Sequence, residues 1–195
     1  MKTDYAISNN LATEFSNYRL SIFPGQQVKH SLKEIVEEFE GKPDDQDYEL
    51  ILMKFSIRNA FENTMLRFLD NLMRRQSCFD LALNNFGGDP RGSIFLRLMG
   101  QEKIERFLSS FEPLSGFIQA DKGKFIRYFG NQSVYLWRNL TEDVFRQRML
   151  QLSQQTFHES FPVDTFYLFR EDNAYKTSRL VQIFRLKGSE YFTNN

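Results

Sequence analysis

Two stretches of alternating side chains stand out in the hydrophobic and polar pattern of this chain. Tyr48–Phe55 and Gln132–Leu140 each switch faces residue by residue, which is typical of a β-strand. In the first stretch this alternation places Glu49, Ile51 and Met53 on one face. We therefore expect two strands of similar character, one in each half of the chain.

The second stretch repeats this arrangement with different side chains. Ser133, Tyr135 and Trp137 share one face of the strand. Strict alternation would put Lys54 on the face opposite Glu49, and it would put Arg138 on the face opposite Tyr135 unless a bulge turns it. Only side chains on the same face of a strand can contribute to one site, so the assignment of faces determines the candidate residues.

The same periodicity predicts the remaining elements. Further strands are expected at Tyr18–Phe23, Cys78–Phe86, Ser93–Leu98, Val163–Arg170 and Leu180–Leu186. Helical stripes are expected at Val28–Phe39, Phe61–Leu72, Ile104–Phe111 and Phe145–Leu152. Asn59 with Glu62 resembles a capping box, and Thr141 is the expected N-cap of the last helix. The third helix is expected to fade around Pro113–Gly116, and Gln119–Gly130 is ambiguous, with Phe125 and Phe129 expected to turn inward.

The order of these elements indicates an internal repeat. Strand, helix, strand, turn and strand follow one another in residues 48–98 and again in residues 132–186. Two such units predict an α+β fold, in which two pseudo-symmetric lobes of antiparallel sheet are backed by helices around a central cleft. We expect a polar arm at residues 1–15, one bilobal domain at residues 16–188 and a tail at residues 189–195.

The composition is that of a soluble globular protein. Twenty-five basic residues balance 25 acidic ones, so no overall positive field attracts nucleic acid. The single cysteine, Cys78, excludes an internal disulfide framework and fits a reducing compartment. No apolar run approaches the roughly 18 residues of a membrane span. We expect a cytoplasmic protein without membrane, metal or cofactor.

The chain resembles the 2H phosphoesterase superfamily, the 2′-5′ RNA ligase-like proteins, from about Tyr18 to Leu186. Tyr48–Phe55 stands where that family places its first His-x-Thr/Ser motif, and Gln132–Leu140 stands where it often has Pro-His-x-Thr-x-x-Arg. The Phe86-Gly87 hairpin, the strand Ser93–Leu98, and Phe169-Arg170 with Tyr175 are similar to the family's hairpins. The resemblance implies two lobes whose motif strands face each other across a cleft.

The resemblance also implies a chemistry that needs two imidazoles. One takes a proton from the attacking oxygen and the other protonates the leaving oxygen, while hydroxyls two residues on bind the phosphate. In this chain Glu49 and Ile51 occupy the first motif, and Ser133 and Tyr135 occupy the second. The only two histidines, His30 and His158, begin no such motif. We therefore expect no catalytic residue of the usual kind.

The leading hypothesis is a catalytically silent protein whose remodelled cleft binds a ligand or a partner. Its candidate binding residues are Glu49, Met53, Ser133, Tyr135, Trp137 and Arg138. A nucleotide or RNA-like ligand is one option, since aromatic faces suit base stacking, and a protein partner is another. Two alternatives stay open: an active phosphoesterase or RNA ligase-like enzyme that uses other groups such as Glu49 and Tyr135, and a homo-oligomeric scaffold whose cleft is filled.

Overall fold

The computed structural model describes residues 14–40, 48–128, 133–172 and 177–188 of the 195-residue chain. The strands are β1 (Phe15–Ile22), β2 (Leu50–Arg58), β3 (Phe79–Asp89), β4 (Ser93–Met99), β5 (Phe125–Arg127), β6 (Ser133–Trp137), β7 (His158–Val163), β8 (Thr165–Asp172) and β9 (Thr177–Arg185). The helices are α1 (Gln26–Glu40), α2 (Glu62–Met73), α3 (Gln101–Ser109), α4 (Glu112–Ala120) and α5 (Glu142–Leu152), and a short 3₁₀ turn spans Asn59–Phe61.

The strands form two antiparallel sheets that exchange elements between the halves of the chain. The first sheet has the order β5-β2-β1-β8-β9, and the second has the order β6-β4-β3-β7. The hairpin β3–β4 follows β2 in sequence but pairs with β6, whereas the hairpin β8–β9 joins the sheet of β2. The two strands at the motif positions differ in place: β2 is an interior strand of its sheet, and β6 lies at an edge.

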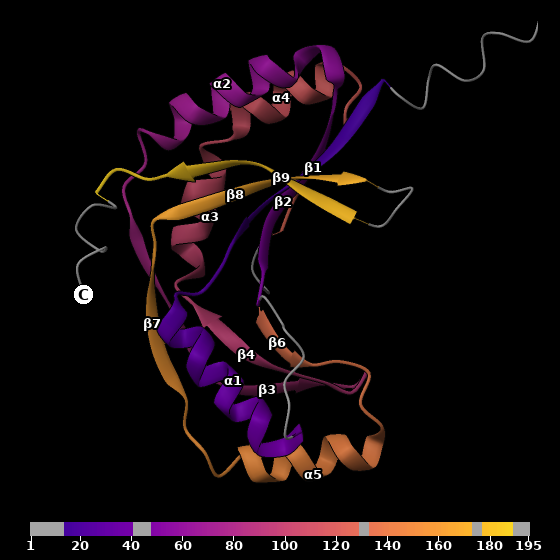
Figure 1. Ribbon diagram of the computed structural model, residues 1–195, viewed down its shortest axis with the longest axis vertical. Helices are drawn as coiled ribbons and strands as arrows, with labels where there is room; N and C mark the ends of the chain where they lie inside the picture. The colour runs from indigo at the N-terminus through magenta and orange to yellow at the C-terminus, as the bar shows by residue number, and fades with distance from the viewer. Residues whose placement is uncertain (1–13, 41–47, 129–132, 173–176, 189–195) are drawn as a thin grey trace, which may run out of the picture.

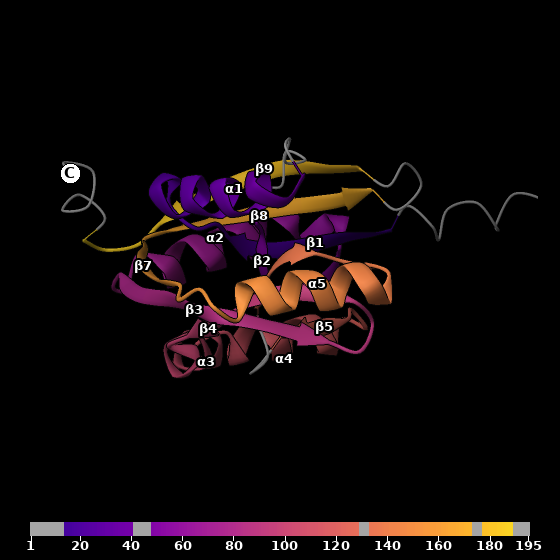
Figure 2. The same cartoon turned by 90° about the horizontal axis from the view of Figure 1, so that it is seen from below.

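The helices cover the outer side of each sheet, which confirms the predicted α+β architecture. In Figure 1, α2 and α4 lie above the five-stranded sheet, and α1 and α5 lie at the opposite end of the molecule beside the four-stranded sheet. Figure 2 shows the strands β9, β8, β1 and β2 one below another, in agreement with the order of the sheet. We call the side of each sheet that faces the other lobe its inner face.

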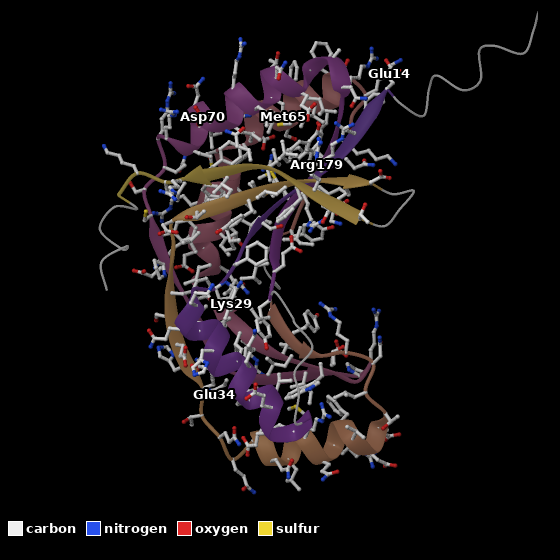
Figure 3. The ribbon with its side chains drawn as sticks, in the orientation of Figure 1. Glu14, Lys29, Glu34, Met65, Asp70 and Arg179 are labelled. Carbon is white, nitrogen blue, oxygen red and sulfur yellow. The ribbon has the colours of Figure 1, made fainter. Side chains whose placement is uncertain are left out.

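Phenylalanine side chains connect the two lobes into one hydrophobic core. The ring of Phe107 on α3 stacks on Phe166 of β8 at 4.4 Å between centroids, and it also contacts Phe79 of β3 at 6.1 Å. Phe166 and Phe79 belong to strands of different sheets. Met65 lies between α2 and the five-stranded sheet, while Asp70 points outward (Figure 3). Met65 is fully buried, as expected for a residue of the hydrophobic stripe predicted for α2.

The structure corrects several sequence predictions of local structure. Asn59, the predicted N-cap, lies in the 3₁₀ turn, and α2 begins at Glu62 with Phe61 at its N-cap position and no side-chain cap there. Glu62 accepts a hydrogen bond from Tyr18 at 2.8 Å. Thr141 does occupy the N-cap position of α5, although its hydroxyl makes no capping hydrogen bond.

The segment after α3 differs as well. Instead of fading near Pro113, the chain forms a second helix there, α4. Proline is tolerated in the first turn of a helix because the N–H that it lacks would have no partner in the helix. The ambiguous segment contains the end of α4 and the strand β5; Phe125 packs against the core as expected, and Phe129 lies outside the described residues. In the part of the chain that the structure describes, no helix is long and apolar enough to cross a membrane.

Candidate functional site

A β-bulge in β2 determines which side chains reach the inner face of the five-stranded sheet. Leu20 of β1 pairs with Met53 and Ser21 pairs with Ile51, so Leu52 is an additional residue of β2 between these two pairs. The bulge reverses the alternation, and Lys54 therefore lies on the same face as Glu49 and Ile51. Met53 turns into the core, where it is 0% exposed.

The strand β6 carries a bulge of the same kind. Ile94 of β4 pairs with Trp137 and Phe95 pairs with Tyr135, so Leu136 is the additional residue. Beyond it, Arg138 returns to the face of Tyr135, and its guanidinium lies 3.5 Å from the centroid of that ring. Trp137 points the other way, is 5% exposed, and packs edge-on against Phe39 of α1 at 5.4 Å.

The two bulges lie at the same distance from the first polar residue of their stretch. Leu52 follows Glu49 by three residues, as Leu136 follows Ser133, and the basic residues Lys54 and Arg138 each come five residues after these starting points. Both strands thus present a first polar residue, a second residue two positions later and a cation on the inner face. The internal repeat itself stays a prediction from the sequence.

An ion-pair network covers the inner face of the five-stranded sheet. Glu49 Oε1 accepts hydrogen bonds from Arg19 Nε at 2.7 Å and from Ser21 Oγ at 2.5 Å. Glu171 of β8 accepts from Lys54 Nζ at 2.8 Å and lies 3.5 Å from Arg19 Nη1. The carboxylates of Glu49 and Glu171 therefore balance the two cations.

Two further contacts anchor the centre of this network. Arg19 donates to Ser178 Oγ at 3.1 Å and lies 4.5 Å from the centroid of the Phe169 ring. The paired side chains line a cavity of about 510 Å³, which Ile51 and Asp172 also border. This face consequently carries no excess of positive charge.

The inner face of the four-stranded sheet is aromatic and basic. Ser133 and Tyr135 of β6 lie opposite Arg97 and Phe95 of β4, and the rings of Phe95 and Tyr135 are 5.5 Å apart. These side chains line a second cavity of about 650 Å³, whose rim also carries Asp89 and Glu102. Within the described part of the chain, Arg97 and Arg138 form no ion pair with a carboxylate.

The structure places the predicted site residues in two groups. Glu49 lines the first cavity, and Ser133 and Tyr135 line the second, with Arg138 stacked on Tyr135. No described residue is shared between these two cavities. The predicted inner positions of Met53 and Trp137 are wrong, because strict alternation ignores the bulges.

Sequence reasoning missed several members of the site. Arg19 and Ser21 lie on the polar side of an alternating strand, so their position was visible in the sequence, but nothing there pointed to Glu49 as their partner. Glu171, Phe95 and Arg97 arrive from hairpins whose pairing crosses between the repeats. Both histidines lie away from the two cavities: His30 is exposed on α1 beside Glu34, and His158 is exposed at the start of β7.

Solved structures with a similar fold include E. coli LigT and TT0787 of Thermus thermophilus. The structure of E. coli LigT complexed with 3′-AMP superposes with a TM-score of 0.51 at 18% sequence identity, covering 89% of this chain and 99% of LigT. The fold is LigT-like. TT0787 of Thermus thermophilus agrees with a TM-score of 0.55 at 18% identity, covering 88% of this chain and 98% of TT0787. No family model matches the sequence, and no curated protein matches it.

Proposed function

We propose that this protein is a LigT-like 2H phosphoesterase relative that binds a nucleotide-like anion on the inner face of its four-stranded sheet without cleaving it. The proposal combines the fold with the identity of the side chains at the two motif positions. It follows that the protein acts by binding, as a sensor, carrier or regulator of its ligand.

The observation that carries the proposal is the network around Glu49. The 2H mechanism needs an imidazole here that exchanges a proton near neutral pH. Glu49 is instead an acceptor for both Arg19 and Ser21, and its side chain is 23% exposed. A carboxylate held in this way serves as a structural counter-ion for Arg19. The second motif begins with Ser133, whose hydroxyl neither gains nor loses a proton near neutral pH.

The groups suited to hold an anion lie on the inner face of the four-stranded sheet. Arg138 and Arg97 supply positive charge that described carboxylates do not pair, and Tyr135 and Phe95 supply ring faces for a base. LigT, whose fold resembles that of this chain, has been seen with 3′-AMP. A ligand with one phosphate and one planar base fits this combination of cation and rings.

The open cavities favour ligand binding over a filled scaffold. Volumes of about 510 Å³ and 650 Å³ border the two motif strands, and both fall in the range of small-molecule sites. The enzymatic alternative requires Glu49 and Tyr135 to act on one bond. Their placement in cavities without a shared described residue gives that alternative no support.

Titration with 3′-AMP, followed by calorimetry or NMR, tests the binding site. We expect saturable binding that Arg138→Met weakens roughly tenfold or more, because a charge-assisted contact is lost. The matched control is Arg146→Met, since Arg146 is an exposed arginine of α5 whose ion pair is with Glu142. Equal affinity of wild type and Arg138→Met, or no binding by the wild type, would contradict the proposed site.

A further inference from the structure

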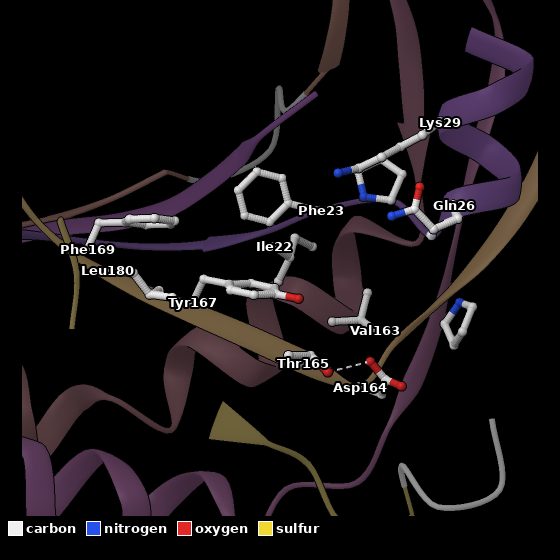
Figure 4. A pocket seen from close by; sticks show the side chains of 13 residues that line it. Ile22, Phe23, Gln26, Lys29, Val163, Asp164, Thr165, Tyr167, Phe169 and Leu180 are labelled. Atoms are coloured by element: carbon white, nitrogen blue, oxygen red, sulfur yellow. Dashed lines mark hydrogen bonds between the residues drawn. The ribbon is translucent and has the colours of Figure 1, made fainter. Parts of the chain in front are cut away.

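A third cavity opens where β1 ends and α1 begins, and neither β2 nor β6 contributes a residue to its lining. It measures about 550 Å³ and is bordered by the corner between β7 and β8 (Figure 4). Neither Glu49, Ser133 nor Tyr135 contributes to it. This size lies within the range of small-molecule pockets, and the function proposed above makes no use of it.

Aromatic rings form the central walls of this cavity. Phe23 meets Tyr167 edge-on at 5.1 Å between centroids and Phe169 at 6.3 Å, and all three side chains are half-buried. Figure 4 shows the Tyr167 hydroxyl directed into the space between Phe23 and Thr165. Partly exposed rings that line a cavity lose further contact with water when a flat apolar ligand packs on them. The walls therefore fit a planar ring.

One end of the cavity is cationic. Lys29 Nζ lies 5.0 Å from the centroid of the Phe23 ring, and no described carboxylate lies within ion-pair distance of it. This differs from Arg19 and Lys54, whose charges are balanced by carboxylates of the first cavity. Gln26 places its amide beside Lys29 in Figure 4. A carboxylate or another single negative group would supply the charge partner that Lys29 lacks among the described residues.

The other end is anionic. Asp164 lies across the cavity from Lys29, and one of its oxygens accepts a hydrogen bond from the Thr165 hydroxyl at 2.8 Å (Figure 4). A second negative group on the ligand would be repelled here, whereas an N–H donor would be bound by the remaining oxygen. This polarity excludes polyanionic nucleotides and selects for one anionic group and one donor at opposite ends.

From these contacts we infer a second binding site, for a small planar aromatic monoanion that carries an N–H donor opposite its negative group. Lys29 and Gln26 bind the anionic group, Phe23 and Tyr167 pack on the ring, and Asp164 accepts the donor. No residue of β2 or β6 lines this site, so the inference stands whether or not a nucleotide binds to the four-stranded sheet.

The test uses 4-aminobenzoate as probe, with benzoate and aniline as partial probes. We expect saturable binding of 4-aminobenzoate by calorimetry or NMR, weaker binding of the other two, and at least a roughly tenfold loss in Lys29→Met. Lys29→Met keeps the apolar stem of the side chain, and an unchanged melting temperature verifies folding. In Asp164→Asn the preference for 4-aminobenzoate over benzoate should shrink.

Controls at the motif strands separate this site from the first one. Arg138→Met should leave 4-aminobenzoate binding unchanged, just as Lys29→Met should leave 3′-AMP binding unchanged. The inference is overturned if the wild type does not bind 4-aminobenzoate saturably. It is likewise overturned if Lys29→Met binds the probe as well as the wild type does, or if Arg138→Met weakens that binding as much as Lys29→Met.

Discussion

At the scale of single residues, two buried tyrosines differ in whether the hydroxyl has a partner. Tyr18 donates to Glu62, whereas the Tyr48 hydroxyl is buried and has no hydrogen-bond partner in the described structure. Burial raises the pKa of Tyr18 to about 12, with Glu62 adding to the shift. Burial also raises the pKa of Tyr48 to about 12, with the charge of Glu37 as the second cause.

This contrast predicts that removal of the hydroxyl group changes the free energy of unfolding differently for the two tyrosines. Tyr18→Phe should lower the free energy of unfolding by about 1–2 kcal/mol, since a hydrogen bond to a carboxylate is lost. Tyr48→Phe should leave this free energy unchanged or raise it, because an unsatisfied buried hydroxyl disappears. Urea denaturation at neutral pH measures both. A larger loss in Tyr48→Phe than in Tyr18→Phe would contradict the assignment of partners.

The same tyrosines predict how stability depends on pH. Their pKa values in the folded chain lie above the value of about 10 expected when it is unfolded, so the folded state holds these protons more tightly. Their contribution is complete below pH ~10 and is lost as the pH rises from ~10 towards 12. Denaturation across this range should show a steep decline that becomes flatter in Tyr48→Phe. If the free energy of unfolding declines identically in Tyr48→Phe and in the wild type, this prediction is wrong.

At the scale of elements, the bulges in β2 and β6 decide the composition of the site. Each one reverses the alternation of its strand, so that a hydrophobic residue enters the core and a cation reaches the inner face. Met53 and Lys54 are adjacent, and they exchange the roles that uninterrupted alternation would give them. Point substitutions can therefore reveal the register.

We predict that Met53→Lys is strongly destabilising and that Lys54→Met is tolerated. Met53 is 0% exposed, so a lysine there would bury an unpaired charge at a cost of roughly 3 kcal/mol or more. Lys54 is 34% exposed and loses only its pairing with Glu171, worth about 0–1 kcal/mol. Thermal or urea unfolding of the two variants provides the comparison. The reverse order of stabilities would mean that β2 has no bulge.

The sequence predicts most strands and helices of this fold because their hydrophobic periodicity reflects burial. Val28–Phe39 and Ser93–Leu98 appear in the structure close to their predicted places, as α1 and β4. The bulges were not predictable, since an extra residue leaves no mark in a run such as Leu50–Met53, where every side chain is apolar. For the same reason Met53 and Trp137 were assigned to the site, and Lys54 was assigned to the wrong face.

At the scale of the whole molecule, the two halves of the chain are interleaved. Each sheet takes its motif strand from one half of the chain and its main hairpin from the other half. Strands from both halves of the chain complete each sheet, and Phe107 contacts Phe79 of one sheet and Phe166 of the other. The inner faces are consequently built by residues far apart in sequence, which explains why partners such as Glu171 and Arg97 were found only in three dimensions.

The central proposal is that this chain, whose fold is LigT-like, binds its ligand without the proton-transfer groups needed to cleave phosphodiesters. The most direct measurement is turnover of a 2′,3′-cyclic nucleotide and of a 2′-5′-linked dinucleotide by the wild-type protein, with Glu49→Ala and Tyr135→Phe in parallel. We predict no turnover above the uncatalysed reaction in any of the three. Turnover by the wild type that either substitution abolishes would contradict the claim and identify the protein as an enzyme.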